Sequence, residues 1–290
     1  MSLDTRAFLV PPSPSTLRLS DYDAASKGGF DDKEESQACL QDDVEQLCKL
    51  HDVFAAQSKH ALLVVLQGMD TAGKDGIIKH VMSGMNPQGV SVYGFRKPSE
   101  EELRHDFLWR ESKVLPERGR ITIFNRSYYE EVLILKVIPQ LLESEGAAGG
   151  DPTEWERRYE DINAFERHLT NTGTIVLKFC LHLSKNEQRR RLLARLEDPK
   201  KMWKASDADL EGHEQWDEYV AAYEAMLGHT STPWAPWYLV PADRKWVTRA
   251  VVGGAIVEAL QRLDLKYPEP NAERRELFAR LATQLRGEDR

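Results

Sequence analysis

Short apolar runs alternate with amphipathic stretches along most of the chain. Five runs are almost continuously apolar and predict buried strands over 61–67, 89–95, 120–124, 174–181 and 237–240. Elsewhere apolar residues recur every three or four positions, which predicts helices over 33–58, 77–84, 127–143, 153–171, 207–228 and 244–264. Strands that alternate with helices predict an α/β fold of three layers, with a parallel sheet of five strands covered on both faces.

Two more helices are expected from polar signals. Pro98 to Glu102 is typical of a capped helix start, and the helix would carry Leu103, Phe107 and Leu108 inward. The charged tail 271–287 is also expected to be helical.

The pattern contains no internal repeat and no linker long enough to divide the chain. Residues 1–58 are expected to form an N-terminal arm and a helix packed on the core, because 1–32 are rich in Pro, Ser, Asp and Gly. Residues 59–290 then form one domain, which includes a helical lid at about 185–210.

A glycine-rich segment follows the first predicted strand and precedes a predicted helix. It reads Gly68-Met-Asp-Thr-Ala-Gly-Lys-Asp-Gly76. In this context it is typical of a P-loop, whose backbone N–H groups and lysine bind phosphate. The candidate phosphate-binding residues are Gly68, Thr71, Ala72, Gly73, Lys74, Asp75 and Gly76.

The segment departs from the common P-loop pattern, because Asp75 stands where a Ser or Thr usually follows the lysine. Together with Asp70 it puts carboxylates among expected phosphates, which favours a divalent cation between them. The alternative is that each aspartate only caps the helix.

Polar residues also follow the third predicted strand. Asn125 stands where a metal-binding carboxylate is expected, and Glu130 or Glu131 could restore the missing charge. Arg126 has no apolar reason to follow a buried strand, which favours phosphate binding. The alternative for Arg126 is a structural salt bridge. The alternative for the two glutamates is a solvated helix face.

The fourth predicted strand leads through Ser184, a predicted helix cap, into a strongly basic segment, 185–204. It contains Arg191, Arg195, Lys200 and Lys204, with few acidic residues beside them. We expect a cationic surface for a long polyanion, and a solvated helix face is the alternative.

Charge and composition limit the remaining possibilities. The net charge of −8 argues against nucleic-acid binding. Neither a span of 18 apolar residues nor an N-terminal signal pattern occurs, so a cytoplasmic protein without a membrane span is expected. The three cysteines are too scattered for a disulfide framework or a zinc site. Cys180 and His182 are expected to be core residues rather than catalytic groups.

Four motifs in this order resemble the polyphosphate kinase 2 family. They are the P-loop above, Phe124-Asn-Arg-Ser-Tyr-Tyr-Glu-Glu-Val132, Lys178-Phe-Cys-Leu-His-Leu-Ser-Lys185 and Asp198-Pro-Lys-Lys-Met-Trp-Lys204. The resemblance covers residues 35–268. It implies a P-loop kinase-like fold and reversible phosphoryl transfer between inorganic polyphosphate and nucleotides, with Mg²⁺ or Mn²⁺.

The resemblance also implies roles for single residues. Asp70 would be the catalytic carboxylate and, with Glu130, a metal ligand, while Lys74 and Arg126 would bind phosphate. Asn125 with Glu130 is similar to the class III subgroup, which accepts nucleoside mono- and diphosphates. Homo-oligomers are common in the family. An ATP-dependent nucleoside monophosphate kinase and a non-catalytic polyphosphate or nucleotide sensor remain the alternatives.

Overall fold

The computed structural model describes residues 3–12, 16–141 and 153–288. At its centre is an all-parallel sheet in the order β2-β3-β1-β4-β5. The strands are β1 (Ala61–Gln67), β2 (Val90–Gly94), β3 (Ile121–Asn125), β4 (Thr174–His182) and β5 (Trp237–Pro241). The predicted parallel α/β sheet of five strands is confirmed.

Strand β1 lies at the centre of the sheet, and all seven of its residues are buried. Val64 pairs with Ile123 of β3 on one side and with Leu177 of β4 on the other. A strand that is buried on both faces has no need of alternating polar residues, which explains its continuous apolar run.

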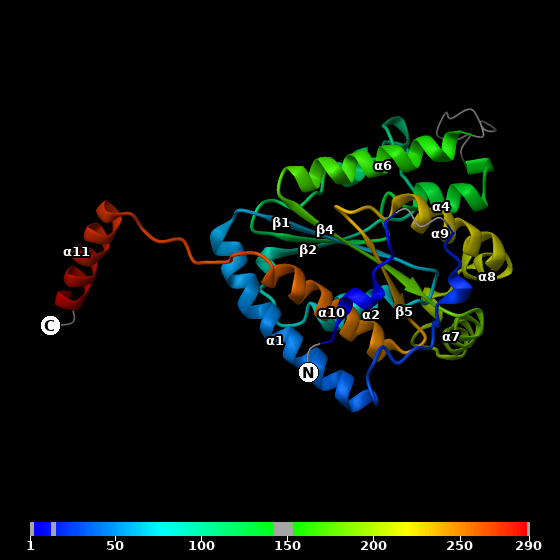
Figure 1. Cartoon of the computed structure of the whole chain (residues 1–290), viewed down its shortest axis with the longest axis horizontal. Helices are drawn as coiled ribbons and strands as arrows, with labels where there is room; N and C mark the ends of the chain where they lie inside the picture. The colour runs from blue at the N-terminus through cyan, green and yellow to red at the C-terminus, as the bar shows by residue number, and fades with distance from the viewer. Residues whose placement is uncertain (1–2, 13–15, 142–152, 289–290) are drawn as a thin grey trace.

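Helices cover both faces of the sheet (Figure 1). One layer contains α1 (Lys33–Gln57), α2 (Lys74–Val81) and α10 (Lys245–Gln261). The opposite layer contains α4 (Glu130–Val137), α6 (Glu154–Asn171) and α9 (Trp216–Thr230). Leu62 and Val64 point into the first layer and Leu63 and Val65 into the second, as the two-residue repeat of a strand requires.

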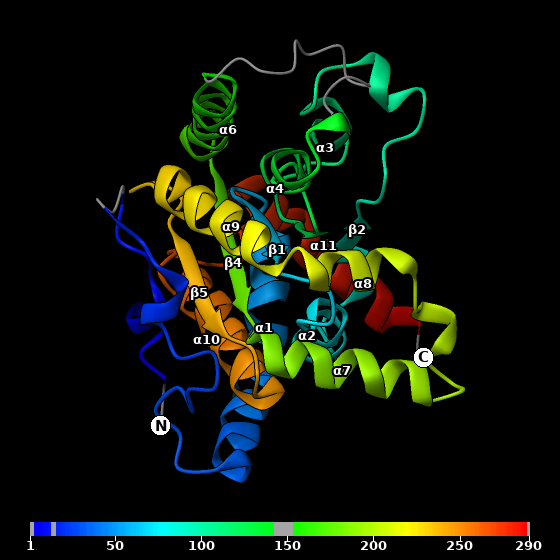
Figure 2. The same ribbon diagram turned by 90° about the vertical axis from the view of Figure 1, so that its right-hand side faces the viewer.

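Two helices cross the carboxyl ends of the strands, α7 (Lys185–Glu197) and α8 (Asp207–Glu214) (Figure 2). The hydroxyl of Ser184 accepts a hydrogen bond from the N–H of Glu187 at 3.2 Å, so the predicted cap of α7 is confirmed. The short turn η5 (Met202–Lys204) joins the two helices.

Several of the predicted helices are wrong in extent. After β2 the chain forms only the short turn η4 (Glu102–Arg104) and the single-turn α3 (Trp109–Ser112). Asp106 explains the break, because its carboxylate accepts from the N–H of Leu108 and favours a local turn over a continuous helix. The predicted helix 207–228 is divided at Gln215 into α8 and α9. The predicted helix 127–143 is also too long, because α4 ends at Val137 and Ile138 leaves the helical conformation. Residues 142–143 and the loop after them lie outside the described residues.

The two ends of the chain differ in how they attach to the sheet. The N-terminal arm adds the short turns η1 (Thr5–Phe8) and η2 (Leu19–Asp21), and Val10 donates to the carbonyl of Trp237 in β5 at 2.8 Å. A further turn, η3 (Pro87–Gly89), precedes β2. The C-terminal α11 (Ala272–Glu288) lies well away from the sheet, with exposed leucines along it (Figure 1).

Asp43 of α1 is buried against Gly253 and Gly254 of α10. Burial, with a smaller contribution from the charge of Asp42, raises the pKa of Asp43 to about 6. A folded-state pKa above the unfolded value means that this group costs stability as the pH rises through about 6. We expect Asp43→Asn to stabilise the protein by about 1 kcal/mol at pH 8, after allowance for screening by water.

Thermal melting between pH 4 and pH 8 measures this effect, with Asp52→Asn on the exposed face of α1 as the control. The gain should disappear near pH 4, where Asp43 is already neutral in the folded protein. An equal gain at both pH values would attribute it to packing instead.

Candidate active site

Three segments meet at the carboxyl end of the sheet, namely those that follow β1, β3 and β4. The strand register places the ends of these strands side by side, with Leu66 opposite Asn125 and Gln67 opposite Cys180. The N–H of Arg126 donates to the carbonyl of Leu66 at 3.1 Å, which ties the second segment to the first. Ligands of open α/β sheets bind at this edge.

The segment 68–76 turns tightly enough that two positions require glycine. Gly68 has φ +155°, and a Cβ there would lie 2.9 Å from the Cβ of Leu181 on β4. Gly73 has φ +115° and is the N-cap residue of α2. In the first turn of α2 the N–H of Gly76 donates to the carbonyl of Gly73 at 2.9 Å, whereas the N–H groups of Lys74 and Asp75 precede the first intrahelical hydrogen bond and can receive an anion. The geometry is that of an anion-binding loop at a helix N-terminus.

Two residues of the site that are not glycine also have left-handed backbones, Thr71 at φ +67° and Arg126 at φ +65°. Such a conformation costs about 1–3 kcal/mol, most of all for a β-branched residue, and persists only where the surroundings enforce it. The buried hydroxyl of Thr71 has no hydrogen-bond partner within the described residues. The strain is concentrated in the two turns that face each other across the site.

Lys74 is buried at the centre of the turn. Its ammonium donates to the carbonyl of Gly68 and lies 3.4 Å from that of Met69. Burial lowers the pKa of Lys74, and the carboxylate of Asp70 partly opposes that shift. The ammonium therefore lies inside the loop, held by main-chain oxygens.

Arg126 lies between two carboxylates. Its guanidinium is 2.6 Å from Asp70 and 3.6 Å from Glu130, and the Gln67 amide donates to Glu130 at 3.1 Å. Burial lowers the pKa of Arg126, but Glu130 and then Asp70 outweigh that effect and raise it. The structure thus brings together Asp70, Arg126 and Glu130, which the sequence separates by up to 60 positions.

Asp75 and Asn125 form a separate contact. The Asn125 amide donates to the Asp75 carboxylate at 2.9 Å, and the ammonium of Lys204 lies 3.4 Å from its second oxygen. Partial burial opposes ionisation of Asp75, but the hydrogen bond from Asn125 and the charge of Lys204 lower its pKa. Gly73 is the N-cap residue of α2, so neither Asp70 nor Asp75 occupies the N-cap position, but Asp75 lies in the first turn, where its charge also stabilises the N-terminus of the helix.

The oxygens around Arg126 suit Mg²⁺. Two carboxylates converge on one guanidinium, and the buried amide oxygen of Gln67 has no hydrogen-bond partner within the described part of the chain. Mg²⁺ is typically held by one or two carboxylates, with water and substrate phosphates as the remaining ligands. Within the same residues no three His, Cys, Asp or Glu side chains form a closed protein site. The donor set therefore fits an ion that is completed by phosphate.

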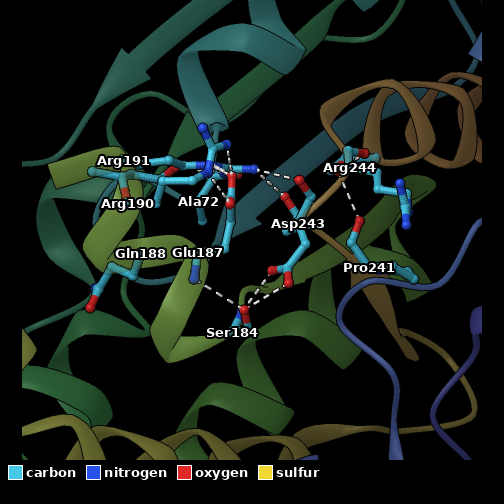
Figure 3. A network of polar contacts seen from close by, with 12 residues as sticks. Ala72, Ser184, Glu187, Gln188, Arg190, Arg191, Pro241, Asp243 and Arg244 are labelled. Carbon is cyan, nitrogen blue, oxygen red and sulfur yellow. Dashed lines mark hydrogen bonds and ion pairs between the residues drawn. The ribbon is translucent and has the colours of Figure 1, made fainter. Parts of the chain in front are cut away.

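The contacts of Arg191 differ from those predicted (Figure 3). Its side chain is buried and donates to the carbonyls of Thr71, Ala72, Ala242 and Asp243 at 2.7–3.1 Å, and it forms an ion pair with Glu187 at 2.7 Å. The expectation that Arg191 contacts a polymer directly is wrong, because all its donors are used within the protein. These contacts of Arg191 hold α7 against the strained turn of the P-loop.

The rest of the basic segment is also more paired than its composition suggested. Arg195 forms an ion pair with Asp209 at 2.7 Å, and Lys201 forms one with Asp198 at 2.6 Å. Lys200 is exposed and Lys204 reaches Asp75. The cationic surface that remains is smaller than expected, because ion pairs with Asp209 and Asp198 occupy part of it.

Several residues near the site were not predicted. Gln188 of α7 lies 3.5 Å from the carbonyl of Asp70 and contacts the ring of His213 at 2.7 Å. Behind the site, the ammonium of Lys178 is fully buried against Glu166 at 2.7 Å and the Tyr129 hydroxyl at 2.8 Å. A lysine inside an apolar run was the signal that could have revealed this network.

Of the two side chains that were expected in the core, Cys180 is buried as predicted, whereas His182 is only partly buried. Cys180 is buried, and burial raises the pKa of its thiol to about 12. The His182 ring contacts the carbonyl of Tyr22 at 2.9 Å and is occupied structurally.

Comparisons with known proteins agree with this geometry. The family model described as Polyphosphate kinase 2 (PPK2) matches residues 30–268. The chain is 48% identical over 288 residues to an ADP-polyphosphate phosphotransferase of Rhodopseudomonas palustris, and the alignment covers 98% of this chain and 99% of the relative. It is 44% identical over 253 residues to an AMP/ADP-polyphosphate phosphotransferase of Meiothermus ruber, covering 86% of this chain and 89% of the relative.

A solved structure has the same architecture. The crystal structure of polyphosphate kinase 2 from Arthrobacter aurescens TC1 superposes with a TM-score of 0.87 at 39% identity, covering 97% of this chain and 98% of the other. The matched family model includes the P-loop, the Arg126 segment and the basic helix together. This chain belongs to the polyphosphate kinase 2 family.

Proposed function

We propose that the protein transfers a phosphoryl group reversibly between inorganic polyphosphate and ADP or AMP. The observation that carries the proposal is the Arg126 guanidinium held between Asp70 and Glu130 at the mouth of the P-loop. Phosphoryl transfer depends on positioning and on neutralisation of charge, and this arrangement supplies both signs of charge at one place. The family membership and the names of the two relatives support the same reaction.

Direct in-line transfer is the mechanism that these residues suit. The N–H groups of the α2 first turn and Lys74 bind phosphate oxygens. Arg126 can exchange one carboxylate for a phosphate oxygen and neutralise the transferring group, because its fork of donors fits either partner. Mg²⁺ or Mn²⁺, held by Asp70 and Glu130, would neutralise phosphate oxygens at the same point. Direct transfer requires no covalent intermediate on a side chain.

The segment 185–210 is suited to act as a lid over this centre. Lys204 contacts Asp75 across 129 positions of sequence, so η5 lies against the start of α2. Both side chains are substantially exposed, so the contact is weak and can open. A closed lid would exclude water from the transferring group.

An ATP-forming assay tests the proposal directly. Purified protein, polyphosphate, Mg²⁺ and ADP should yield ATP without any second nucleoside triphosphate. AMP should also be phosphorylated, because Asn125 and Glu130 are similar to the class III subgroup. Formation of product only when ATP is supplied would favour the monophosphate kinase. Polyphosphate binding without turnover would favour the sensor.

The lysines around η5 should act on the polymer more than on the nucleotide. Replacing Lys200 and Lys204 together with Ala should raise the KM for polyphosphate about tenfold, and more at high salt, because contacts to a polyanion weaken as counterions compete. The KM for ADP should change much less. Steady-state kinetics at two ionic strengths measure the effect, with Lys266→Ala, on the exposed segment before α11, as the control. Equal increases in both KM values would assign these lysines to the nucleotide.

We also propose that the protein forms homo-oligomers. In α11 the exposed side chains of Leu277, Phe278 and Leu281 leave apolar surface that association could cover. Among the described helices, none combines the length and apolarity that a membrane span requires.

A further inference from the structure

A buried network of polar side chains lies behind the candidate active site, in the layer of α4, α6 and α9, and the phosphoryl-transfer mechanism does not use it. The ammonium of Lys178 on β4 and the carboxylate of Glu166 on α6 are both fully buried and lie 2.7 Å apart. The same ammonium donates to the Tyr129 hydroxyl at 2.8 Å and to the carbonyl of Thr230, the last residue of α9, at 2.7 Å. All three donors of the ammonium therefore have partners.

Two consecutive tyrosines complete the network. The hydroxyl of Tyr128 donates to one carboxylate oxygen of Glu166 at 2.9 Å, and the hydroxyl of Tyr129 donates to the same oxygen at 2.7 Å. Burial, and then the negative charge of Glu166, raise the pKa of both phenols well above the ordinary value, so both remain protonated donors. The side chains of Tyr128, Tyr129, Glu166 and Lys178 form the Glu166 network.

The tyrosines belong to the turn that carries two residues of the phosphate centre. Arg126 lies two positions before Tyr128, and Glu130 directly follows Tyr129. The N–H of Tyr129 donates to the Ser127 hydroxyl at 3.2 Å, and the N–H of Glu130 donates to the Ser127 carbonyl at 2.9 Å, which closes the turn. A shift or rotation of the tyrosines would therefore move the guanidinium of Arg126 relative to its carboxylate partners.

The network fixes the rotation of this turn as well as its depth. Consecutive residues of a helical turn point about 100° apart, and Tyr129 is the N-cap residue of α4, with a helical backbone. Two hydroxyls that approach one oxygen from different directions prevent a rotation that a single hydrogen bond would allow. Arg126 depends on such a constraint, because its left-handed backbone, at φ +65°, is strained and persists only where the surroundings enforce it.

Stability alone is a poor explanation for a charged pair in this position. Burial of two charges costs solvation energy that their attraction only partly returns, and apolar side chains of similar volume often stabilise a core equally well. The surroundings here are already apolar and aromatic, since the Lys178 ammonium lies over the Trp237 ring, 5.0 Å from its centroid. A polar network in which every donor and acceptor is paired adds a unique and rigid geometry, which an apolar core specifies less strictly.

We propose that the Glu166 network holds the Arg126 guanidinium in the position between its two carboxylates that phosphoryl transfer requires. The inference rests on the proposed function, since it assigns the network to that reaction. The four members are positioning residues, because all of them are fully buried. They act through the turn 126–130 and not by contact with phosphate.

Removal of the two hydroxyls tests this role. Tyr128→Phe combined with Tyr129→Phe keeps both rings in the core. The kcat for ATP formation should fall about tenfold, while the KM values for ADP and polyphosphate stay within twofold, at a temperature well below the melting temperature of either protein. Tyr159→Phe on α6 is the matched control, because it removes the hydroxyl of a buried tyrosine from the same layer, and kcat should stay within twofold. An unchanged kcat in the folded double variant would overturn the proposal.

A double-mutant cycle separates positioning from a general loss of structure. If the network acts through Arg126, the two Phe substitutions should lower kcat less than threefold in a protein that already carries Arg126→Lys. An undiminished tenfold loss in that background would overturn the proposal. Tyr128→Phe alone keeps every contact of Lys178 and should fold even where the double variant does not. It should lower kcat at least threefold, and no loss would also count against the proposal.

The position of Arg126 can be measured without turnover, which separates this inference from the proposed function. In crystal structures, the guanidinium should contact Asp70 and Glu130 together in the native protein and lose at least one of these contacts in the double Phe variant. Retention of both contacts in the variant would refute the inference, whichever phosphoryl donor the protein uses. If the native protein formed no ATP from polyphosphate, the function would be refuted and this structural comparison would still decide the role of the network.

Discussion

Asp70→Asn should reduce turnover roughly 10³-fold and leave the fold intact. The substitution keeps the size of the side chain but removes a charge at the phosphoryl centre, where lost electrostatic stabilisation commonly costs several kcal/mol. The fold should tolerate it because the Asp70–Arg126 pair is about one-third exposed, and ion pairs of that kind contribute about 1 kcal/mol or less. Arg126 also keeps Glu130 as a partner.

Initial rates of ATP formation and a thermal melt together measure this effect. Asp264→Asn, at an exposed position far from the site, is the control for a lost surface carboxylate. Activity close to that of the native protein, with an unchanged melting temperature, would show that Asp70 has no part in the chemistry. Increasing the Mg²⁺ concentration should restore part of the activity if Asp70 contributes to holding the ion.

Arg126→Lys should lower kcat by about 10²- to 10³-fold although it keeps the positive charge. Lysine is a compact point charge and cannot present the parallel donors with which arginine binds two oxygens at once. In the structure the guanidinium spans Asp70 and Glu130, so an ammonium would satisfy one carboxylate and leave the other. The loss should appear mainly in kcat, because the interaction strengthens as charge develops on the transferring group.

Arg120→Lys is the matched control, since Arg120 precedes β3 and is exposed at the opposite end of the strand. It should change kcat less than twofold. If Arg126→Lys were to raise only the KM for the nucleotide and leave kcat unchanged, Arg126 would bind substrate without acting on the transition state.

Much of this protein could be predicted from local patterns. Examples are the apolar run of β1 and the three- to four-residue spacing of apolar positions in α1. Each segment packs against a continuous apolar surface, so its pattern can be recognised without knowing which residues it contacts. The glycines of the P-loop are equally local signals, because the ability to adopt a positive φ without strain is a property of glycine itself. These signals were sufficient to indicate the sheet, the phosphate-binding turn and Lys74.

The local patterns failed where polar side-chain contacts determine the backbone conformation. The segment after Pro98 has helical spacing, but the Asp106 carboxylate bonds to the N–H of Leu108 and favours turns. The interruption between α8 and α9 falls at Gln215, three residues after Gly212, and a single glycine within a helical pattern does not define where a helix ends.

By itself the sequence determined the order of strands and helices, the P-loop and the residues that carry charge to the edge of the sheet. Only the tertiary structure decided what those charges do. Arg191 looked like a free cation because four of its five acceptors are main-chain carbonyls, which every residue has and no sequence pattern marks. The carboxylate of Asp209 that pairs with Arg195 comes from the next helix. Local sterics and hydrogen bonding act over a few residues, whereas these pairings depend on how separate elements pack.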